Sequence, residues 1–182
     1  MQGGDTGRSV GRMTGTGARE VLADGFGRVG PVLRDALDGL DREDLTWRPA
    51  PRANTLAWLV WHVARVQDAQ VAPLAGTPQV WTSDGWVDRF ALPFDREATG
   101  YGQDAGEVAQ VDAPADLLLG YLEAATAATL AYLERVDDDD LGTVVDEAWD
   151  PPVTLGVRLV SVLDDCAQHA GQAAYVRGLL RA

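Results

Sequence analysis

The chain has 182 residues, 46% of them hydrophobic, and a formal net charge of −13. This length suits one domain with a sizeable core. The acidic surface argues against nucleic-acid partners, and no run approaches the ~20 apolar residues of a membrane span. The single cysteine excludes an internal disulfide, so we expect a reducing, cytoplasmic setting.

The chain divides into a short leader and one domain. Residues 1–17 are rich in Gly, Ser, Thr and Arg and lack the apolar core of a signal peptide, which predicts a disordered leader. The leader also lacks the GK[ST] ending of a phosphate-binding loop. Residues 18–182 are then expected to form the whole folded domain.

The first helix is predicted over residues 18–40, where apolar side chains recur at three- and four-residue spacing. Pro31 is expected to kink this helix or to begin a second segment. Residues 41–54 contain two prolines and are predicted to be a loop.

The second helix is predicted over residues 55–75, with Asn54 or Thr55 as its N-cap. The first half of this segment is apolar nearly all round, which indicates a buried helix. On a helical wheel His62 shares its arc with apolar residues and therefore faces inward, and Arg65 follows one turn later.

The segment 76–113 has no long periodicity apart from WTSDGWVDRF, which could form a short helix. It nevertheless carries more aromatic residues than a solvated linker needs: Trp81, Trp86, Phe90, Phe94 and Tyr101. Loops of this length in a compact domain are usually functional, so we expect a covering segment or lid.

Pro114 is predicted to open a third helix over residues 114–136. The aspartate run 137–140 then favours a solvated turn, because the spaced ligands and glycine of a calcium loop are missing. A fourth helix is predicted over 155–181, with Thr154 as its N-cap. Four long helices without alternating runs predict an all-α four-helix bundle with at most two short strands.

The fourth helix places a carboxylate and an imidazole on its core-facing arc, since Asp165 and His169 lie four residues apart. A carboxylate there is costly unless something pairs with it. His62 is the other histidine of the chain and also faces inward. Two histidines and one carboxylate from facing helices are typical of a metal site with open coordination positions.

Simpler explanations remain open at this point. A core histidine is more often hydrogen-bonded than metal-bound, and Asp165 could pair with Arg158 or orient His169. Cys166 could be a nucleophile, but it has no obvious base and buried cysteines are usually inert.

Three segments resemble the DinB-like superfamily, and in particular its actinobacterial branch of mycothiol-dependent S-transferase-like proteins. They are NTLAWLVWHVARVQDAQVAPLAG, VWTSDGWVDRFALPFDREATGYG and WDPPVTLGVRLVSVLDDCAQHAGQAAYVRGLL. The resemblance implies an up-down-down-up bundle with a long crossover loop between helices 2 and 3. It also implies that the protein could form a homodimer.

The resemblance further implies a metal triad of one histidine from the second helix and an HxxxH pair from the fourth. His62 and His169 match two of these ligands, while Asp165 stands where the family has the first histidine of the pair. Aspartate retains the capacity to bind a metal but makes the site harder and more anionic. Zinc is our first choice of ion, with nickel, iron or manganese as alternatives.

The implied chemistry is transfer of a low-molecular-weight thiol to an electrophilic small molecule, in detoxification or stress. Arg158 and Gln172 are the candidate catalytic helpers, and Arg65 and Ser161 the candidate residues for binding the cosubstrate. Two other functions stay open: a metal-dependent hydrolase or isomerase that uses metal-bound water, and a non-enzymatic metal-binding stress protein. We expect no nucleic-acid or membrane partner.

Overall fold

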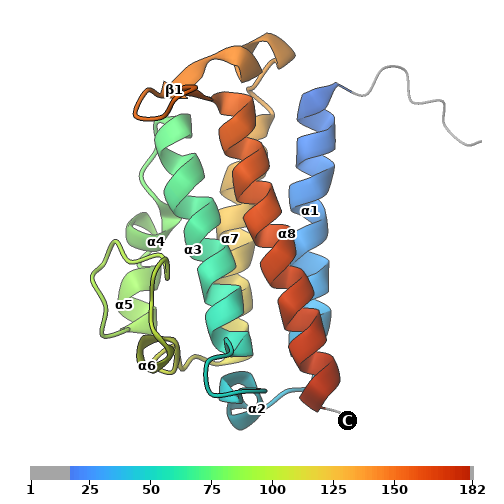
Figure 1. Ribbon diagram of the computed structural model, residues 1–182, viewed down its shortest axis with the longest axis vertical. Helices are drawn as coiled ribbons and strands as arrows, with labels where there is room; N and C mark the ends of the chain where they lie inside the picture. Colours follow the sequence, from blue (N-terminus) through green and yellow to red (C-terminus); the bar gives the residue numbers. More distant parts are fainter. Residues whose placement is uncertain (1–16, 181–182) are drawn as a thin grey trace, which may run out of the picture.

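The computed structural model describes residues 17–180, which contain four long helices (Figure 1). These are α1 (Ala18–Leu37), α3 (Leu56–Ala75), α7 (Ala115–Leu133) and α8 (Leu155–Leu180). The four predicted helices are therefore confirmed to within a few residues. The predicted leader lies outside the described residues, except for Gly17, which precedes α1.

Short elements connect the long helices. The predicted loop 41–54 contains a one-turn helix, which Asp41 caps by accepting hydrogen bonds from two backbone N–H groups. The two strands pair antiparallel, with Val144 opposite Thr154, and stay within the predicted limit. The bounds of these elements are α2 (Arg42–Thr46), α4 (Val80–Ser83), α5 (Trp86–Phe90), α6 (Ala105–Val108), η1 (Asp138–Gly142), β1 (Val144–Asp146) and β2 (Val153–Thr154).

The four long helices form an up-down-down-up bundle (Figure 1). Helices α3 and α7 run parallel, and the segment 76–114 between them returns the chain along the outside of α3. Helix α3 packs against α7 and α8, and α1 packs against the same two helices, so α1 and α3 lie diagonally. The predicted all-α bundle with a long crossover is thus confirmed.

Burial differs between the helices. Helix α1 buries one stripe of side chains, and Pro31 lies on its exposed side. The helix continues past Pro31 to Leu37, so Pro31 does not begin a second segment. Helix α3 is buried without interruption from Leu56 to Arg65, because the crossover segment covers the side that the bundle leaves open. Within residues 17–180, no helix combines the length and apolar character needed to cross a membrane.

The ends of α3 are fixed by local sequence. Thr55 caps the N-terminus by accepting a hydrogen bond from the Trp58 N–H at 3.0 Å, as predicted. Gly76 ends the helix in the left-handed conformation, with φ of 67°. The helix that carries His62 is therefore a rigid support.

Candidate metal centre

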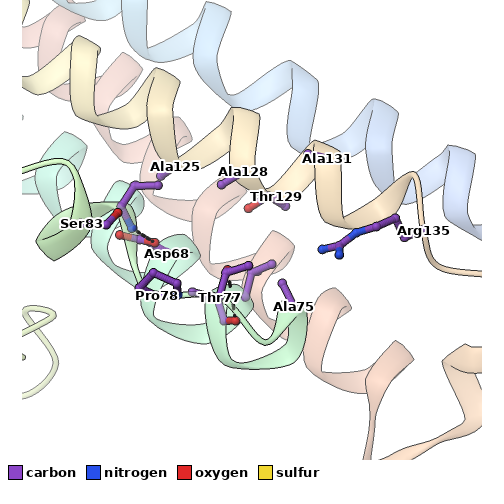
Figure 2. Close-up of a pocket in the computed structure, with 13 residues that line it drawn as sticks. Asp68, Ala75, Thr77, Pro78, Ser83, Ala125, Ala128, Thr129, Ala131 and Arg135 are labelled. Carbon is purple, nitrogen blue, oxygen red and sulfur yellow. Dashed lines mark hydrogen bonds between the residues drawn. The ribbon is translucent and has the colours of Figure 1, made fainter.

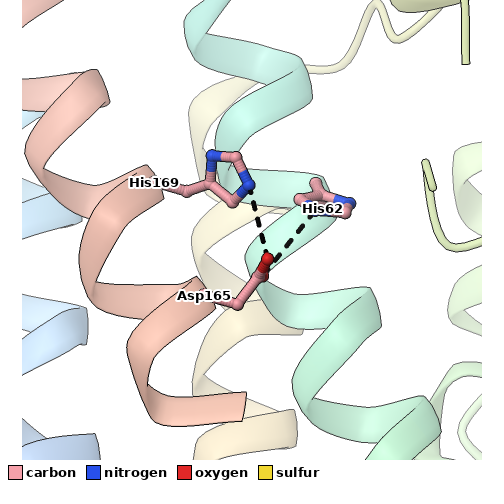
Figure 3. Close-up of side chains that lie close together, drawn as sticks. All are labelled: His62, Asp165 and His169. Carbon is pink, nitrogen blue, oxygen red and sulfur yellow. Dashed lines mark ion pairs between the residues drawn. The ribbon is translucent and has the colours of Figure 1, made fainter. Parts of the chain in front are cut away.

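His62 lies in the middle of α3, and Asp165 and His169 lie one turn apart on the facing side of α8 (Figure 3). The Nε2 atoms of His62 and His169 are 3.7 Å and 3.6 Å from the two oxygens of Asp165. These distances are too long for hydrogen bonds but close to the roughly 3.4 Å between two ligands on one tetrahedral zinc ion. One ligand atom from each residue lies within 4.8 Å of the others, so the structure brings the predicted triad together.

Both imidazoles are held in the tautomer that a metal ligand requires. Nδ1 of His62 lies 2.5 Å from the backbone oxygen of Thr99. Because a carbonyl only accepts, this nitrogen carries the proton and leaves the Nε2 lone pair free. Nδ1 of His169 lies 3.0 Å from Oε1 of Gln172, and in this orientation of the amide it donates and leaves Nε2 free. The two free Nε2 atoms both face Asp165 (Figure 3).

The environment of the Asp165 carboxylate also favours a bound metal ion. Oδ2 of Asp165 is buried and has no hydrogen-bond partner among residues 17–180. A buried carboxylate oxygen without a partner is costly. A divalent cation between the three residues would remove this cost, and two imidazoles with one carboxylate form an ordinary donor set for zinc, iron, nickel or manganese. The residues present therefore fit a metal ion.

Trp58 and Gly100 restrict the position of the His62 ring. Trp58 stacks on it, with ring centroids 4.5 Å apart and an interplanar angle of 13°. Gly100 lies against the Nδ1 edge of the ring, since a Cβ at this position would lie 2.6 Å from Nδ1 of His62. The backbone φ of Gly100 is +97°, which also disfavours any other residue. Gln103 accepts a hydrogen bond from Nε1 of Trp58 and anchors the same segment at 2.7 Å.

The electrostatics favour a neutral His62. Burial lowers the pKa of His62 from its ordinary value of 6.5, and the hydrogen bond to Thr99 opposes this shift without cancelling it. Repulsion from a protonated His169 lowers the same pKa further, while Asp165 raises it. A histidine that stays neutral at physiological pH is ready to bind a metal ion.

The other predicted site residues are placed as follows. Gln172 contacts the triad through His169. Arg158 donates to Gln70 and to Asp146 of β1, so the pairing with Asp165 considered above is replaced by one with Asp146. The hydroxyl of Ser161 donates to the backbone of its own helix at Val157. Catalytic or binding roles for Arg158 and Ser161 stay predictions.

Arg65 is fully buried, and its Nε and NH1 groups donate to protein acceptors, while its NH2 group has no hydrogen-bond partner among residues 17–180. Its Nε donates to the Ala98 carbonyl at 3.0 Å, and its NH1 group donates to Gln79 at 2.8 Å and to the Tyr121 hydroxyl at 3.1 Å. Its predicted role in binding a cosubstrate is not tested by these contacts. Cys166 is also buried, and burial raises the pKa of its thiol far above the ordinary value.

Sequence reasoning missed the support that the crossover gives to the triad. The acceptor for His62 is the backbone of Thr99, and a backbone carbonyl leaves no trace in a residue pattern. The run TGYG at residues 99–102 does carry a signal, because both of its glycines adopt positive φ. Two glycines around an aromatic residue in a segment that must cover a helix indicate a close backbone approach.

A separate cavity of about 330 Å³ lies between α3, α4 and α7 (Figure 2). Asp68 and Ser83 lie toward one end and Arg135 toward the other, and alanines of α7 form much of one wall. None of the three triad residues lines it. The cavity is therefore distinct from the candidate metal centre.

An up-down-down-up bundle with metal ligands on its second and fourth long helices defines the DinB-like class. The family model described as mycothiol-S-transferase matches residues 26–182, so the chain belongs to this family. A solved structure of a conserved protein from Enterococcus faecalis is also similar, with 34% identity and a TM-score of 0.84. That match covers 90% of this chain and 96% of the other. No curated protein matches the chain.

Proposed function

We propose that this protein is a metal-dependent S-transferase, which joins a low-molecular-weight thiol of the mycothiol type to an electrophilic small molecule. The observation that carries the proposal is the triad of His62, Asp165 and His169, with both Nε2 atoms free, in a chain of the mycothiol-S-transferase family. Detoxification or a stress response is the role that such a reaction would serve.

Three side chains would hold the ion: Nε2 of His62, Nε2 of His169 and the carboxylate of Asp165. When bound, a divalent ion would lower the pKa of a coordinating thiol and so supply a thiolate nucleophile at neutral pH. Three protein ligands leave coordination positions open. We keep zinc as the first choice, with nickel, iron or manganese as alternatives.

The chain's own residues orient the ligands. The Thr99 carbonyl and the Gln172 amide each hold one imidazole proton at Nδ1. The single negative charge of Asp165 leaves the loaded site with a net positive charge that favours an anionic sulfur. In the reaction, sulfur forms a bond to the electrophilic carbon, the leaving group departs with its electron pair, and the thiol proton passes to solvent.

The experiment is a conjugation assay with purified protein, a divalent metal, mycothiol or another small thiol, and a bromobimane reagent or haloalkane. We expect a rate that saturates with thiol concentration and disappears when a chelator removes the metal. His62→Ala and His169→Ala should each lower the rate by more than the roughly 10- to 100-fold typical of a lost outer-shell partner.

The same assay separates the alternatives. Turnover of an ester or amide without thiol would favour a hydrolase that uses metal-bound water. Metal binding without any turnover, across several thiols and electrophiles, would favour a binding or stress protein.

Three further expectations accompany the proposal. The partner is a small molecule rather than nucleic acid or membrane, the location is the cytoplasm, and a homodimer is the expected assembly if the resemblance extends to oligomeric state. Light scattering on the purified protein tests the last of these.

A further inference from the structure

Arg65 lies one turn after His62 on α3 and has no exposed surface. A guanidinium group without access to water is costly unless protein groups satisfy it. Two groups of the crossover segment accept hydrogen bonds from it: the carbonyl of Ala98, from Nε at 3.0 Å, and the side chain of Gln79, from NH1 at 2.8 Å. Arg65 therefore fastens the crossover segment to α3 immediately beside the candidate metal centre.

The next carbonyl along the chain belongs to Thr99, and it accepts the hydrogen bond from His62 Nδ1. Two side chains of α3, three positions apart, thus bind two consecutive carbonyls of the crossover. Gly100 follows directly and touches the His62 ring, with no space for a Cβ. Because the contacts are consecutive and close, a shift at Ala98 would move the acceptor of His62.

Arg65 is itself held by rigid elements. Its NH1 group donates to the hydroxyl of Tyr121 on α7, which in turn donates to Asp68 at 2.9 Å. Asp68 also accepts from the backbone N–H groups of Val80 and Trp81. The guanidinium lies 4.9 Å from the centre of the Trp81 ring. Through Arg65, these contacts fix the position of the Ala98 carbonyl relative to α7 and α4 as well as to α3.

We propose that Arg65 is a positioning residue of the metal centre. By holding the Ala98 carbonyl, it places the Thr99 carbonyl where it keeps the His62 proton on Nδ1 and the Nε2 lone pair free. Without Arg65, the proton can move to Nε2, and His62 must return it to Nδ1 before Nε2 can bind a metal, which lowers the metal affinity. This inference rests on the proposed metal centre for its purpose, but the tautomer of His62 can be observed without metal.

The test compares Arg65→Met and Arg65→Lys with wild type by two measurements. Nitrogen-15 NMR of the metal-free protein at pH 8 reports which ring nitrogen of His62 carries the proton, and His62→Ala assigns the signals. Titration with cobalt or zinc gives the metal affinity. Arg65→Met should mix the two tautomers and also release the orientation of the His62 ring, and the two effects together should weaken metal binding by about 10- to 100-fold, as for other outer-shell partners.

Arg65→Lys should give an intermediate result, with about a 3- to 10-fold weaker affinity, because an ammonium group lacks the planar fork that reaches Ala98, Gln79 and Tyr121 together. Gln67→Met is the matched control. Gln67 is also fully buried on α3 and donates across to Thr129 of α7, but it has no hydrogen bond to the crossover. Even where this control is less stable than wild type, the tautomer ratio and the metal affinity should stay within about 2-fold of the wild-type values.

The outcomes separate the two proposals. A wild-type protein that binds none of zinc, cobalt, nickel, iron and manganese would overturn the metal centre, while the tautomer measurement would still decide the role of Arg65. A folded Arg65→Met with the wild-type tautomer and affinity would overturn this inference. If Arg65→Met does not fold, wild-type behaviour of Arg65→Lys in both measurements would overturn it. An equal loss in Gln67→Met would also overturn it, because the effect would then be general destabilisation.

Discussion

Asp68 on α3 and Asp165 on α8 show how differently this fold treats two carboxylates. The Asp68 side chain is 2% exposed, and its two oxygens accept hydrogen bonds from Val80, Trp81 and Tyr121. The Asp165 side chain is 36% exposed, yet its buried Oδ2 has no hydrogen-bond partner. The deeper carboxylate is therefore the better satisfied of the two.

The difference indicates that the two residues have different purposes. The Asp68 acceptors are used within the protein, where they join α3 to α4 and α7. The Asp165 acceptors face two imidazole nitrogens that also lack a hydrogen bond, which is the arrangement expected around a cation. Substitution of each aspartate should separate a structural role from a ligand role.

The largest effect should come from Asp68→Ala. This substitution leaves Arg65 buried beside unpaired donors from Trp81 and Tyr121, and loss of one partner of a buried pair typically costs about 3–5 kcal/mol. Urea denaturation of the metal-free protein measures the change in the free energy of unfolding. Asp112→Ala, which removes a surface pair with Arg42, is the control and should cost less than about 1 kcal/mol. Equal costs for the two variants would contradict a structural role for Asp68.

Asp165→Ala should lower the metal affinity and should not lower the stability of the metal-free protein. Metal affinity should fall by at least about 100-fold, equivalent to about 2.7 kcal/mol, because a direct ligand is lost. Stability without metal should stay the same or rise, since an unpaired buried oxygen is removed. Calorimetric titration with zinc measures the metal affinity. Melting curves recorded in the presence of a chelator measure the stability of the metal-free protein.

The neighbouring Asp164 provides the matched control for this prediction. It lies on the same helix but is exposed and accepts a hydrogen bond from Gln168. Asp164→Ala should leave metal affinity within about 2-fold of wild type. If both variants bind zinc as wild type does, Asp165 is not a ligand.

A smaller effect should appear as acid dependence of the metal-free protein. The pKa of His62 is below 6.5 in the folded state, mainly because of burial, whereas unfolding restores the ordinary value. The unfolded chain then binds the proton first, so this contribution to stability is complete above pH 6.5 and is lost as the pH falls. One proton limits the slope to about 1.4 kcal/mol per pH unit.

Denaturation of the metal-free protein in the presence of a chelator, measured between pH 7.5 and 5, checks the direction of this pH dependence. His62→Gln should be less dependent on pH than wild type over the same interval, because the group that resists protonation is gone. A steeper dependence in His62→Gln would show that folding favours the charged imidazole, contrary to the burial argument.

The sequence predicted the bundle and the triad because both depend on helical periodicity. His62, Asp165 and His169 were placed on inward arcs by a wheel, and the wheel is accurate for long, unbroken helices. The resemblance to the DinB-like superfamily then supplied the order of the helices. The family match over residues 26–182 agrees with it.

The supporting contacts could not be predicted in this way. The role of Arg65 depends on Ala98 in a segment without periodicity, and a wheel gives no preferred direction for a helix that is buried on every side. Arg158 was expected near the triad, but the short strand β1 brings Asp146 to it instead. These contacts depend on where irregular backbone lies, which tertiary packing decides.

The smallest effect on the reaction is expected from substitution of Cys166. This residue follows Asp165 on α8, but its side chain is buried in the core. Its thiol is fully buried, 3.9 Å from the Val63 carbonyl, and its raised pKa keeps it protonated at neutral pH. A protonated thiol without solvent access is a poor nucleophile, so Cys166→Ala should keep the rate of thiol conjugation within about 2-fold of wild type. Iodoacetamide should label the native protein only under conditions that unfold it, as measured by mass spectrometry. If Cys166→Ala alone abolished turnover while zinc affinity stayed unchanged, the reaction would proceed through a covalent cysteine rather than through a metal-activated thiol.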